Sequence, residues 1–239
     1  MSAPVRIGVL VPAGNPTVEP ELYRMAPSSV TLHFARLPSG EGSPGTVDGL
    51  EHRLLGYLDS LPAAVPPLAA VRPSVVVLAH TSASYACGFA GEPALQERIA
   101  ALAGCPALTA SRAILAAFEH LGARRIALAV PYPAAVEALG LTYWKAAGLD
   151  VVAHRRLDDV TNIYEETEAR AYALGRAADV PAAQALLISG TGMPTAGIIQ
   201  RLEDDLGKPV ITGQTAALWQ ALRMTRVTAS IKGYGRLLA

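Results

Sequence analysis

Cysteine is scarce in this 239-residue chain, which carries only Cys87 and Cys105. The two form neither a CxxC pair nor the spacing of a zinc finger, so we expect no disulfide framework and a reducing, cytoplasmic compartment. The formal net charge is zero. Because nucleic-acid binders usually carry a basic patch or stripe, we expect no nucleic-acid partner.

Long apolar runs and the usual cofactor motifs are also missing. No run reaches membrane-spanning length and no signal peptide opens the chain, so we expect no membrane association. There is no GxGxxG, Walker or GxSxG motif, which leaves a nucleotide cofactor without support. The histidines show no ligand-like spacing, so we expect neither metal nor cofactor.

What the chain does have is apolar material, with 51% hydrophobic and 17% charged residues. Short β-branched runs predict strands over 5–11, 30–37, 74–79, 125–130, 150–155, 185–189 and 209–212. Helical patterns fill the gaps over 19–25, 47–61, 93–103, 111–121, 134–147, 164–178, 195–206 and 216–223. This alternation predicts an α/β fold with buried parallel strands.

Internal sequence similarity indicates that the chain consists of two similar halves. RIGVLVP from Arg6 matches RIALAVP from Arg125, and VLAHTS ending at Ser82 matches LISGTG ending at Gly192. All four segments are strands that run into a turn. Ligands of open parallel sheets bind beyond the carboxyl ends of the strands, so we expect a cleft where these turns face each other.

The segment His80–Thr81–Ser82 follows the most apolar predicted strand. If a helix begins there, its free backbone N–H groups favour an anion, and the two hydroxyls add donors. Simple helix capping by Thr81 or Ser82 is the alternative.

Other turn residues are weaker candidates. Gly190, Thr191 and Gly192 would let the backbone approach a ligand closely, or they form an ordinary turn. Tyr132 could donate its phenol proton to a carboxylate, whereas Asn15 and Asn162 could be helix caps. Cys87 is interpreted as a small core residue and Cys105 lies at the opposite end of the sheet.

Taken together, these motifs resemble the aspartate/glutamate racemase superfamily over essentially the whole chain, in the branch of maleate cis-trans isomerases and arylmalonate decarboxylases. The resemblance rests on IGVLVP from Ile7, Asn15, VEPE at 18–21, HTSAS at 80–84, VPY ending at Tyr132, Asn162, SGTGMPT at 189–195 and GYGRLL at 233–238. It implies two α/β/α domains with parallel four-stranded sheets, related by a pseudo-twofold axis, and a cofactor-free site in the cleft between them. By motif position the carboxylate would be bound by Thr81, Ser82, Tyr132, Thr191 and Gly192.

The chain departs from the family pattern at the catalytic cysteines, because His80 stands at the first position and Gly190 at the second. An imidazole titrates near neutrality and can move a proton at an α-carbon. Gly190 would leave room for a larger substituent or a water. We therefore expect a cofactor-independent lyase or isomerase, decarboxylase-like or proton-transferring, with His80 as general acid/base.

Several alternatives stay open from the sequence. The chain could have maleate isomerase-like or racemase activity with another catalytic group, or it could bind a carboxylate without catalysis. A metal-dependent hydrolase is less favoured, because His80 has no ligand partners nearby in sequence. We expect a small carboxylate as the partner, and a homo-oligomer is compatible with the sequence. The expected halves are 1–112 plus 214–239, and 113–213.

Overall fold

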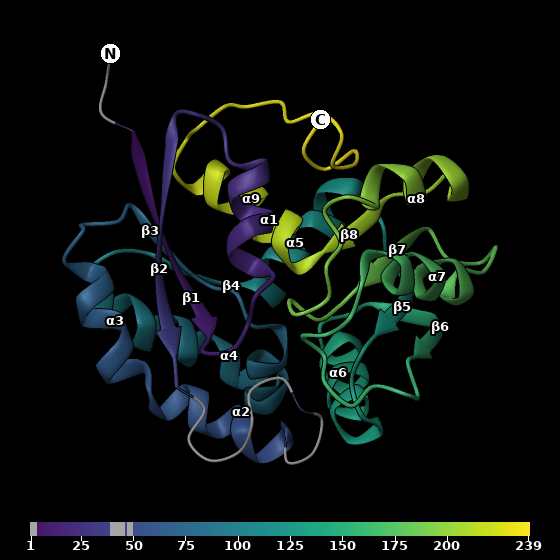
Figure 1. Ribbon diagram of the computed structural model, residues 1–239, viewed down its shortest axis with the longest axis horizontal. Helices are drawn as coiled ribbons and strands as arrows, with labels where there is room; N and C mark the ends of the chain where they lie inside the picture. The colour runs from purple at the N-terminus through teal and green to yellow at the C-terminus, as the bar shows by residue number, and fades with distance from the viewer. Residues whose placement is uncertain (1–3, 39–45, 47–49) are drawn as a thin grey trace.

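Two parallel sheets organise the chain in the computed structural model, which describes residues 4–38, 46 and 50–239 (Figure 1). The first sheet has the order β2-β1-β3-β4 and the second β6-β5-β7-β8. The strands are β1 (Val5–Pro12), β2 (Val30–Leu37), β3 (Val75–Leu78), β4 (Ala107–Thr109), β5 (Arg125–Val130), β6 (Asp150–Arg156), β7 (Ala185–Ile188) and β8 (Val210–Thr212). The equivalent strand orders confirm the predicted α/β fold with two similar four-stranded parallel sheets.

The apolar runs form strands because their side chains are buried on both faces of each sheet. Every residue of β3 and β7 is buried. Seven of the eight strands were predicted within two residues, and β4 was not. It has only three residues, which is too short for a periodic pattern to reveal.

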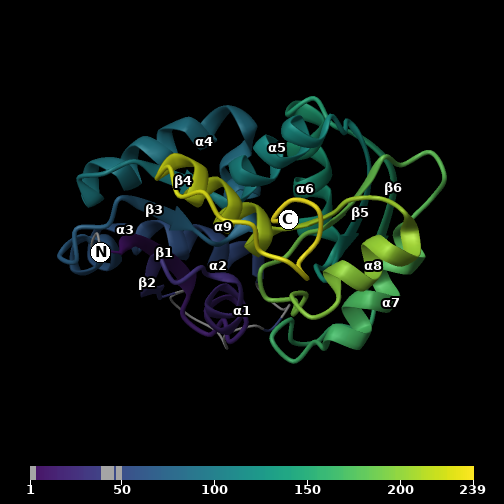
Figure 2. The same cartoon turned by 90° about the horizontal axis from the view of Figure 1, so that it is seen from above.

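Helices cover both faces of each sheet, as Figures 1 and 2 show. They are α1 (Val18–Met25), α2 (Leu50–Asp59), α3 (Leu61–Ala69), α4 (Thr81–Ala103), α5 (Ala110–Leu121), α6 (Ala134–Ala146), α7 (Glu168–Ala178), α8 (Ile199–Leu206) and α9 (Gly213–Met224). One continuous core joins α1, α5, α6 and α9 to the inner faces of both sheets. Residues of α2, α3 and α4 cover the other face of the first sheet, and α7 and α8 cover the other face of the second.

Several predicted helix bounds are wrong. The pattern over 164–178 becomes a helix only from Glu168, and the pattern over 195–206 only from Ile199, because turns occupy the first residues of both. In contrast, α4 starts at Thr81 and runs through Pro93, with a kink at Gly88 where φ is 69°. The pattern over 47–61 contains α2 and the first residue of α3, while residues 47–49 lie outside the described residues.

The carboxyl ends of the central strands of the two halves meet each other directly. The Thr191 hydroxyl after β7 donates to the Ala79 carbonyl after β3, at 2.9 Å. The Tyr85 and Ser189 hydroxyls join at 2.6 Å. The expected division of the chain stays a proposal, and its boundary at 112/113 falls within α5.

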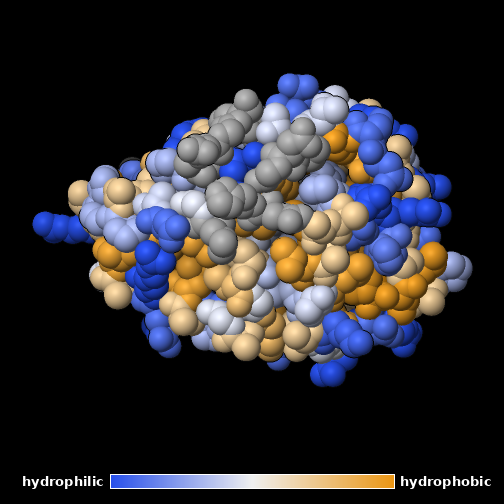
Figure 3. Space-filling view, turned by 90° about the horizontal axis from the view of Figure 1, so that it is seen from below, coloured by the Kyte–Doolittle hydropathy of each residue, from blue (hydrophilic) through white to orange (hydrophobic). Residues whose placement is uncertain are grey.

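The molecular surface is mixed in character. Figure 3 shows hydrophilic side chains around the rim of one face and hydrophobic ones in patches nearer its middle. The large hydrophobic side chains that are exposed within the described ranges are Tyr23, Leu139 and Met224. None of the helices in the described part of the chain is long and apolar enough to cross a bilayer.

Candidate active site

His80 stands between β3 and α4, as the residue that precedes the first turn of the helix. Its backbone is extended, with φ −149° and ψ 93°, and its side chain makes no capping bond. A helix does begin after β3, twelve residues before the predicted start at 93, but Thr81 and Ser82 lie inside it and are not its N-cap. The first-turn amides of α4 therefore lack a side-chain cap from His80 and point toward the strand ends, where an anion would be favoured.

The His80 imidazole is buried, with 6% of the residue exposed. Nε2 lies 3.0 Å from the Ser82 hydroxyl, and the ring of Tyr57 packs edge-on at 4.8 Å between centroids. Nδ1 has no hydrogen-bond partner among the described residues.

Burial also sets the protonation state of His80. It lowers the imidazole pKa from 6.5 to about 4, because the charged form loses its hydration. The expectation that His80 titrates near neutrality is therefore wrong. At neutral pH the imidazole is uncharged and able to accept a proton.

A buried hydroxyl cluster continues from His80 toward the second half. The Tyr132 and Thr81 hydroxyls lie 2.9 Å apart. Burial raises the pKa of Tyr132 and that of Tyr85, so both phenols keep their protons at neutral pH. They can donate hydrogen bonds to an anion but do not act as charged groups.

Gly190 follows β7 with φ +119°, a conformation that side chains rarely adopt. A Cβ atom built there would lie 3.0 Å from the Pro131 ring and 3.2 Å from the Tyr132 hydroxyl oxygen. The room expected opposite His80 is thus absent, because Pro131 and Tyr132 fill the space. Tyr132 stands next to the position where the family pattern has its second thiol.

Asn15 is held by a turn after β1. Its Oδ1 accepts from the amides of Thr17 and Val18, at 2.9 and 3.1 Å. Asn15 is 1% exposed, and its Nδ2 finds no acceptor within the described part of the chain. Asn15 is therefore not the N-cap of α1, which is Thr17, but its side chain holds the turn before the helix and still presents an unused donor.

Asn162 is not at the head of a helix, because α7 begins six residues later. Its Oδ1 accepts from the Tyr164 amide at 2.9 Å and its Nδ2 donates to Glu165 at 3.2 Å. Asn162 therefore shapes the turn that carries Ile163 and Tyr164.

One small cavity collects most of these side chains. Six of the nine predicted site residues line it, namely Asn15, His80, Ser82, Tyr132, Thr191 and Gly192. The other three predicted residues, Thr81, Asn162 and Gly190, do not line the cavity. The remaining wall is formed by Pro12, Leu50, Tyr57, Ile163 and Tyr164, which the sequence did not single out. Its volume is about 10 Å³, room for about one water, so lining side chains must move to admit a substrate.

Arg53 is a further residue that sequence reasoning missed. It is 3% exposed on α2 and donates to the Thr46 carbonyl. Its positive charge acts on Tyr164, one of the residues of the cavity wall, opposing the increase in the Tyr164 pKa that burial causes. No sequence pattern distinguishes Arg53 from the other arginines of the chain.

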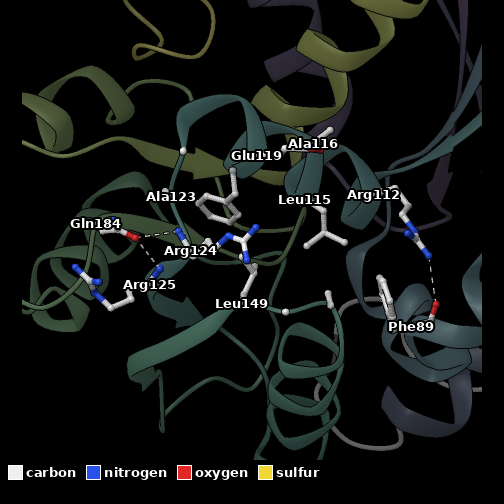
Figure 4. A pocket seen from close by; sticks show the side chains of 14 residues that line it. Phe89, Arg112, Leu115, Ala116, Glu119, Ala123, Arg124, Arg125, Leu149 and Gln184 are labelled. Carbon is white, nitrogen blue, oxygen red and sulfur yellow. Dashed lines mark hydrogen bonds between the residues drawn. The ribbon is translucent and has the colours of Figure 1, made fainter.

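A larger cavity of about 720 Å³ lies elsewhere, beside Phe89, Arg112, Leu115 and Arg124 (Figure 4). It opens at the amino ends of β5, β6 and β7, next to Arg125, Leu149 and Gln184. Ligands of open parallel sheets bind at the opposite edge. The Arg112 guanidinium there is already paired with buried Glu92 at 2.6 Å.

Neither thiol lines the cavity around His80. Cys87 and Cys105 are half-buried and pack against the core under α3 and α4. Burial raises the pKa of both thiols, which makes them poor nucleophiles at neutral pH. Within the described residues, no group of three His, Cys, Asp or Glu side chains could hold a metal ion.

The fold of two α/β halves, together with relatives named arylmalonate decarboxylase and maleate isomerase, marks the chain as an enzyme of the decarboxylase and isomerase type. A family model described as arylmalonate decarboxylase matches residues 7–238. The chain therefore belongs to the arylmalonate decarboxylase family, which confirms the resemblance seen in the sequence.

Named relatives of both kinds match nearly the whole chain. An arylmalonate decarboxylase of Bordetella bronchiseptica is 30% identical over 243 residues, which cover 97% of this chain and 95% of that protein. A maleate isomerase of Nocardia farcinica is 27% identical over 242 residues, covering 98% and 95%. A crystal structure of arylmalonate decarboxylase superposes with a TM-score of 0.79 at 28% identity and covers 98% of both chains.

Proposed function

We propose that this chain is a cofactor-independent lyase for a small carboxylic acid with an apolar α-substituent, with His80 as its general acid/base. One observation carries the proposal. His80 Nδ1 and Asn15 Nδ2 are buried polar atoms without partners among the described residues, and both residues line the same cavity. An unsatisfied buried polar atom is costly, so two at one cavity indicate a polar ligand.

The polar side of the cavity suits a carboxylate. Ser82, Tyr132 and Asn15 offer neutral donors, and the first-turn amides of α4 add a partial positive charge. Thr81 supports this side through its bond to the Tyr132 hydroxyl. The same donors would stabilise the ene-diolate that forms when negative charge moves onto the bound carboxylate.

The rest of the lining supports an apolar substituent. Leu50, Tyr57, Ile163 and Tyr164 are the large apolar and aromatic residues there, and they suit an alkyl or aryl group. The relative named arylmalonate decarboxylase fits this better than those named maleate isomerase, and a malonate with an alkyl or aryl group is the substrate that we propose.

His80 can supply the proton that such a reaction needs. Loss of CO2 from a malonate dianion leaves the electron pair of the broken C–C bond in the ene-diolate, and one proton must then reach the α-carbon. Burial alone lowers the imidazole pKa to about 4. A bound anion favours the imidazolium, so His80 takes up a proton from solvent with the substrate and passes it to the α-carbon.

The test uses malonate, methylmalonate, phenylmalonate and maleate in D2O. Turnover should release CO2 and place deuterium at the α-carbon of the product. His80→Gln and His80→Ala should lower the rate by roughly 10²–10⁴-fold, the usual share of general acid–base catalysis. Cys87→Ala, on the helix that follows His80, is the control and should keep full activity.

Two outcomes would contradict the proposal. Loss of turnover in Cys87→Ala with full activity in both His80 variants would identify a displaced thiol as the catalyst. Measurable binding of the acids without CO2 release or deuterium incorporation would identify a carboxylate-binding protein instead of an enzyme.

A further inference from the structure

The turn after β7 is held in place by the first helix of the other half. Glu21 of α1 is 5% exposed and accepts hydrogen bonds from the amides of Thr195 and Ala196, the latter at 2.7 Å. The Thr195 hydroxyl donates to its second oxygen at 3.3 Å. One turn of the helix earlier, the Thr17 hydroxyl donates to the Gly192 carbonyl at 2.9 Å.

This turn has few bonds of its own. Residues 190–198 form turns and no helix, because α8 begins only at Ile199. The amides of Thr195 and Ala196 are therefore satisfied by the Glu21 carboxyl group and not by a helix. The same turn carries Thr191 and Gly192, which line the cavity.

The beginning of α1 also orients Asn15. The amides of Thr17 and Val18 fix Asn15 Oδ1, which leaves Nδ2 at the cavity. A single piece of chain, residues 15–21, thus positions one donor of the first half directly and the turn of the second half through Thr17 and Glu21.

We propose that Glu21 is a positioning residue, which sets Thr191 and Gly192 for carboxylate binding through its bonds to Thr195 and Ala196. The inference rests on the proposed function, since the carboxylate is the ligand that this turn would contact. Glu21 itself does not line the cavity.

Charge gives the proposal a measurable signature. Burial raises the Glu21 pKa to about 7, against the lowering effect of the bonds from Ala196 and Thr195. The charged groups near it are Glu168 of α7, which also raises this pKa, and Arg24, which lies 3.6 Å from Glu168. Glu19 on the same helix is paired with Arg36. Ionised Glu21 adds negative charge near an anion site, so carboxylate affinity should fall as the pH rises through about 7.

Glutamine at this position separates the bonds from the charge. Its Oε1 can accept from both amides, and its NH2 can donate to the Thr195 hydroxyl. Malonate is the probe, and calorimetry at pH 6 and 8 gives its Kd for the wild type, Glu21→Gln and Glu21→Ala. Glu19→Gln is the matched control. Hydrogen exchange of the 190–197 segment, compared at one pH, reports the turn itself.

Glu21→Ala should raise the malonate Kd by about ten-fold or more, the size expected for loss of a hydrogen bond to a charged group. It should also speed exchange at Thr195 and Ala196. Glu21→Gln should bind like the wild type at pH 6 and weaken less than the wild type at pH 8, because only the pH dependence that comes from proton uptake by His80 remains. Glu19→Gln should follow the wild type at both values.

The inference is overturned if Glu21→Ala keeps the wild-type Kd, or if Glu21→Gln binds malonate as weakly as Glu21→Ala at pH 6. Should Glu21→Ala not fold, a Glu21→Gln Kd that weakens with pH as in the wild type overturns it as well. If malonate does not bind the wild type, the proposed function fails, and hydrogen exchange of the 190–197 segment still tests the positioning role of Glu21. Equal exchange rates at Thr195 and Ala196 in Glu21→Ala and the wild type would then overturn the positioning role.

Discussion

Replacing His80 by glutamine should make the protein less sensitive to acid. In the folded wild type, burial lowers the imidazole pKa from 6.5 to about 4, whereas the unfolded chain binds the proton at its ordinary pKa. The unfolded state therefore takes up more protons between these values. The stability that the neutral imidazole contributes is complete above about pH 6.5 and is lost as the pH falls through about 4.

The size of the effect follows from the pKa shift. At about 1.4 kcal/mol per pKa unit, the full loss is about 3 kcal/mol, and about 2.5 kcal/mol of it is reached at about pH 4.5. Glu21 works in the opposite direction, since its pKa is raised to about 7 and the fold gains stability as this group is protonated. Both proteins contain Glu21, so its contribution cancels in the difference between them.

Urea denaturation of the wild type and His80→Gln at pH 7.5 and 4.5 measures this difference. Cys87→Ala is the control, because it lies on the helix that follows His80 and its raised thiol pKa keeps it from titrating in this range. The control should retain the acid sensitivity of the wild type. If His80→Gln loses as much stability between the two pH values as the wild type does, the imidazole is not desolvated in the folded state and the reasoning is refuted.

Two further predictions concern the second half of the cavity. Gly190→Cys should not create a working thiol, because its Cβ would meet Pro131 and Tyr132 and its φ is +119°. Urea denaturation should show that the variant loses roughly 1–3 kcal/mol of folding stability. A variant as stable as the wild type and more active would contradict this. Tyr132→Phe and Thr81→Ala should each weaken malonate binding by about 1–3 kcal/mol, measured by calorimetry. Because the Thr81 and Tyr132 hydroxyls share a hydrogen bond, the double variant should lose less binding free energy than the sum of the two single variants. Unchanged malonate affinity in both single variants would contradict the proposal that these hydroxyls support carboxylate binding.

Much of the fold and site was predictable because parallel strands impose a simple geometry. The runs at β1, β3, β5 and β7 are buried on both faces, and their carboxyl ends share an edge of each sheet. Residues just after those ends, such as Asn15, His80 and Tyr132, could be assigned to one site from sequence position alone. The position of these residues directly after the strands was enough to assign them to the site.

The rest depends on contacts between distant segments. Tyr57 lies on α2 and contacts His80 only because α2 packs near the start of α4, so no local sequence pattern marks it. The His80 pKa depends on desolvation, which the sequence does not display. The space at Gly190 was misjudged for the same reason, because the side chains that fill it come from the turn after β5.

The groups at the cavity bear on which reaction is proposed. His80 stands at one of the family's cysteine positions, and Tyr132 stands beside the other. Burial raises the Tyr132 pKa, so its phenol stays protonated and serves as a donor, whereas the uncharged imidazole can accept and return a proton. Two-base racemisation needs a second group that exchanges protons readily near neutral pH, and Tyr132 does not meet that need. Decarboxylation requires one proton at one carbon, which a single imidazole supplies, and this is the physical reason for preferring it over racemisation.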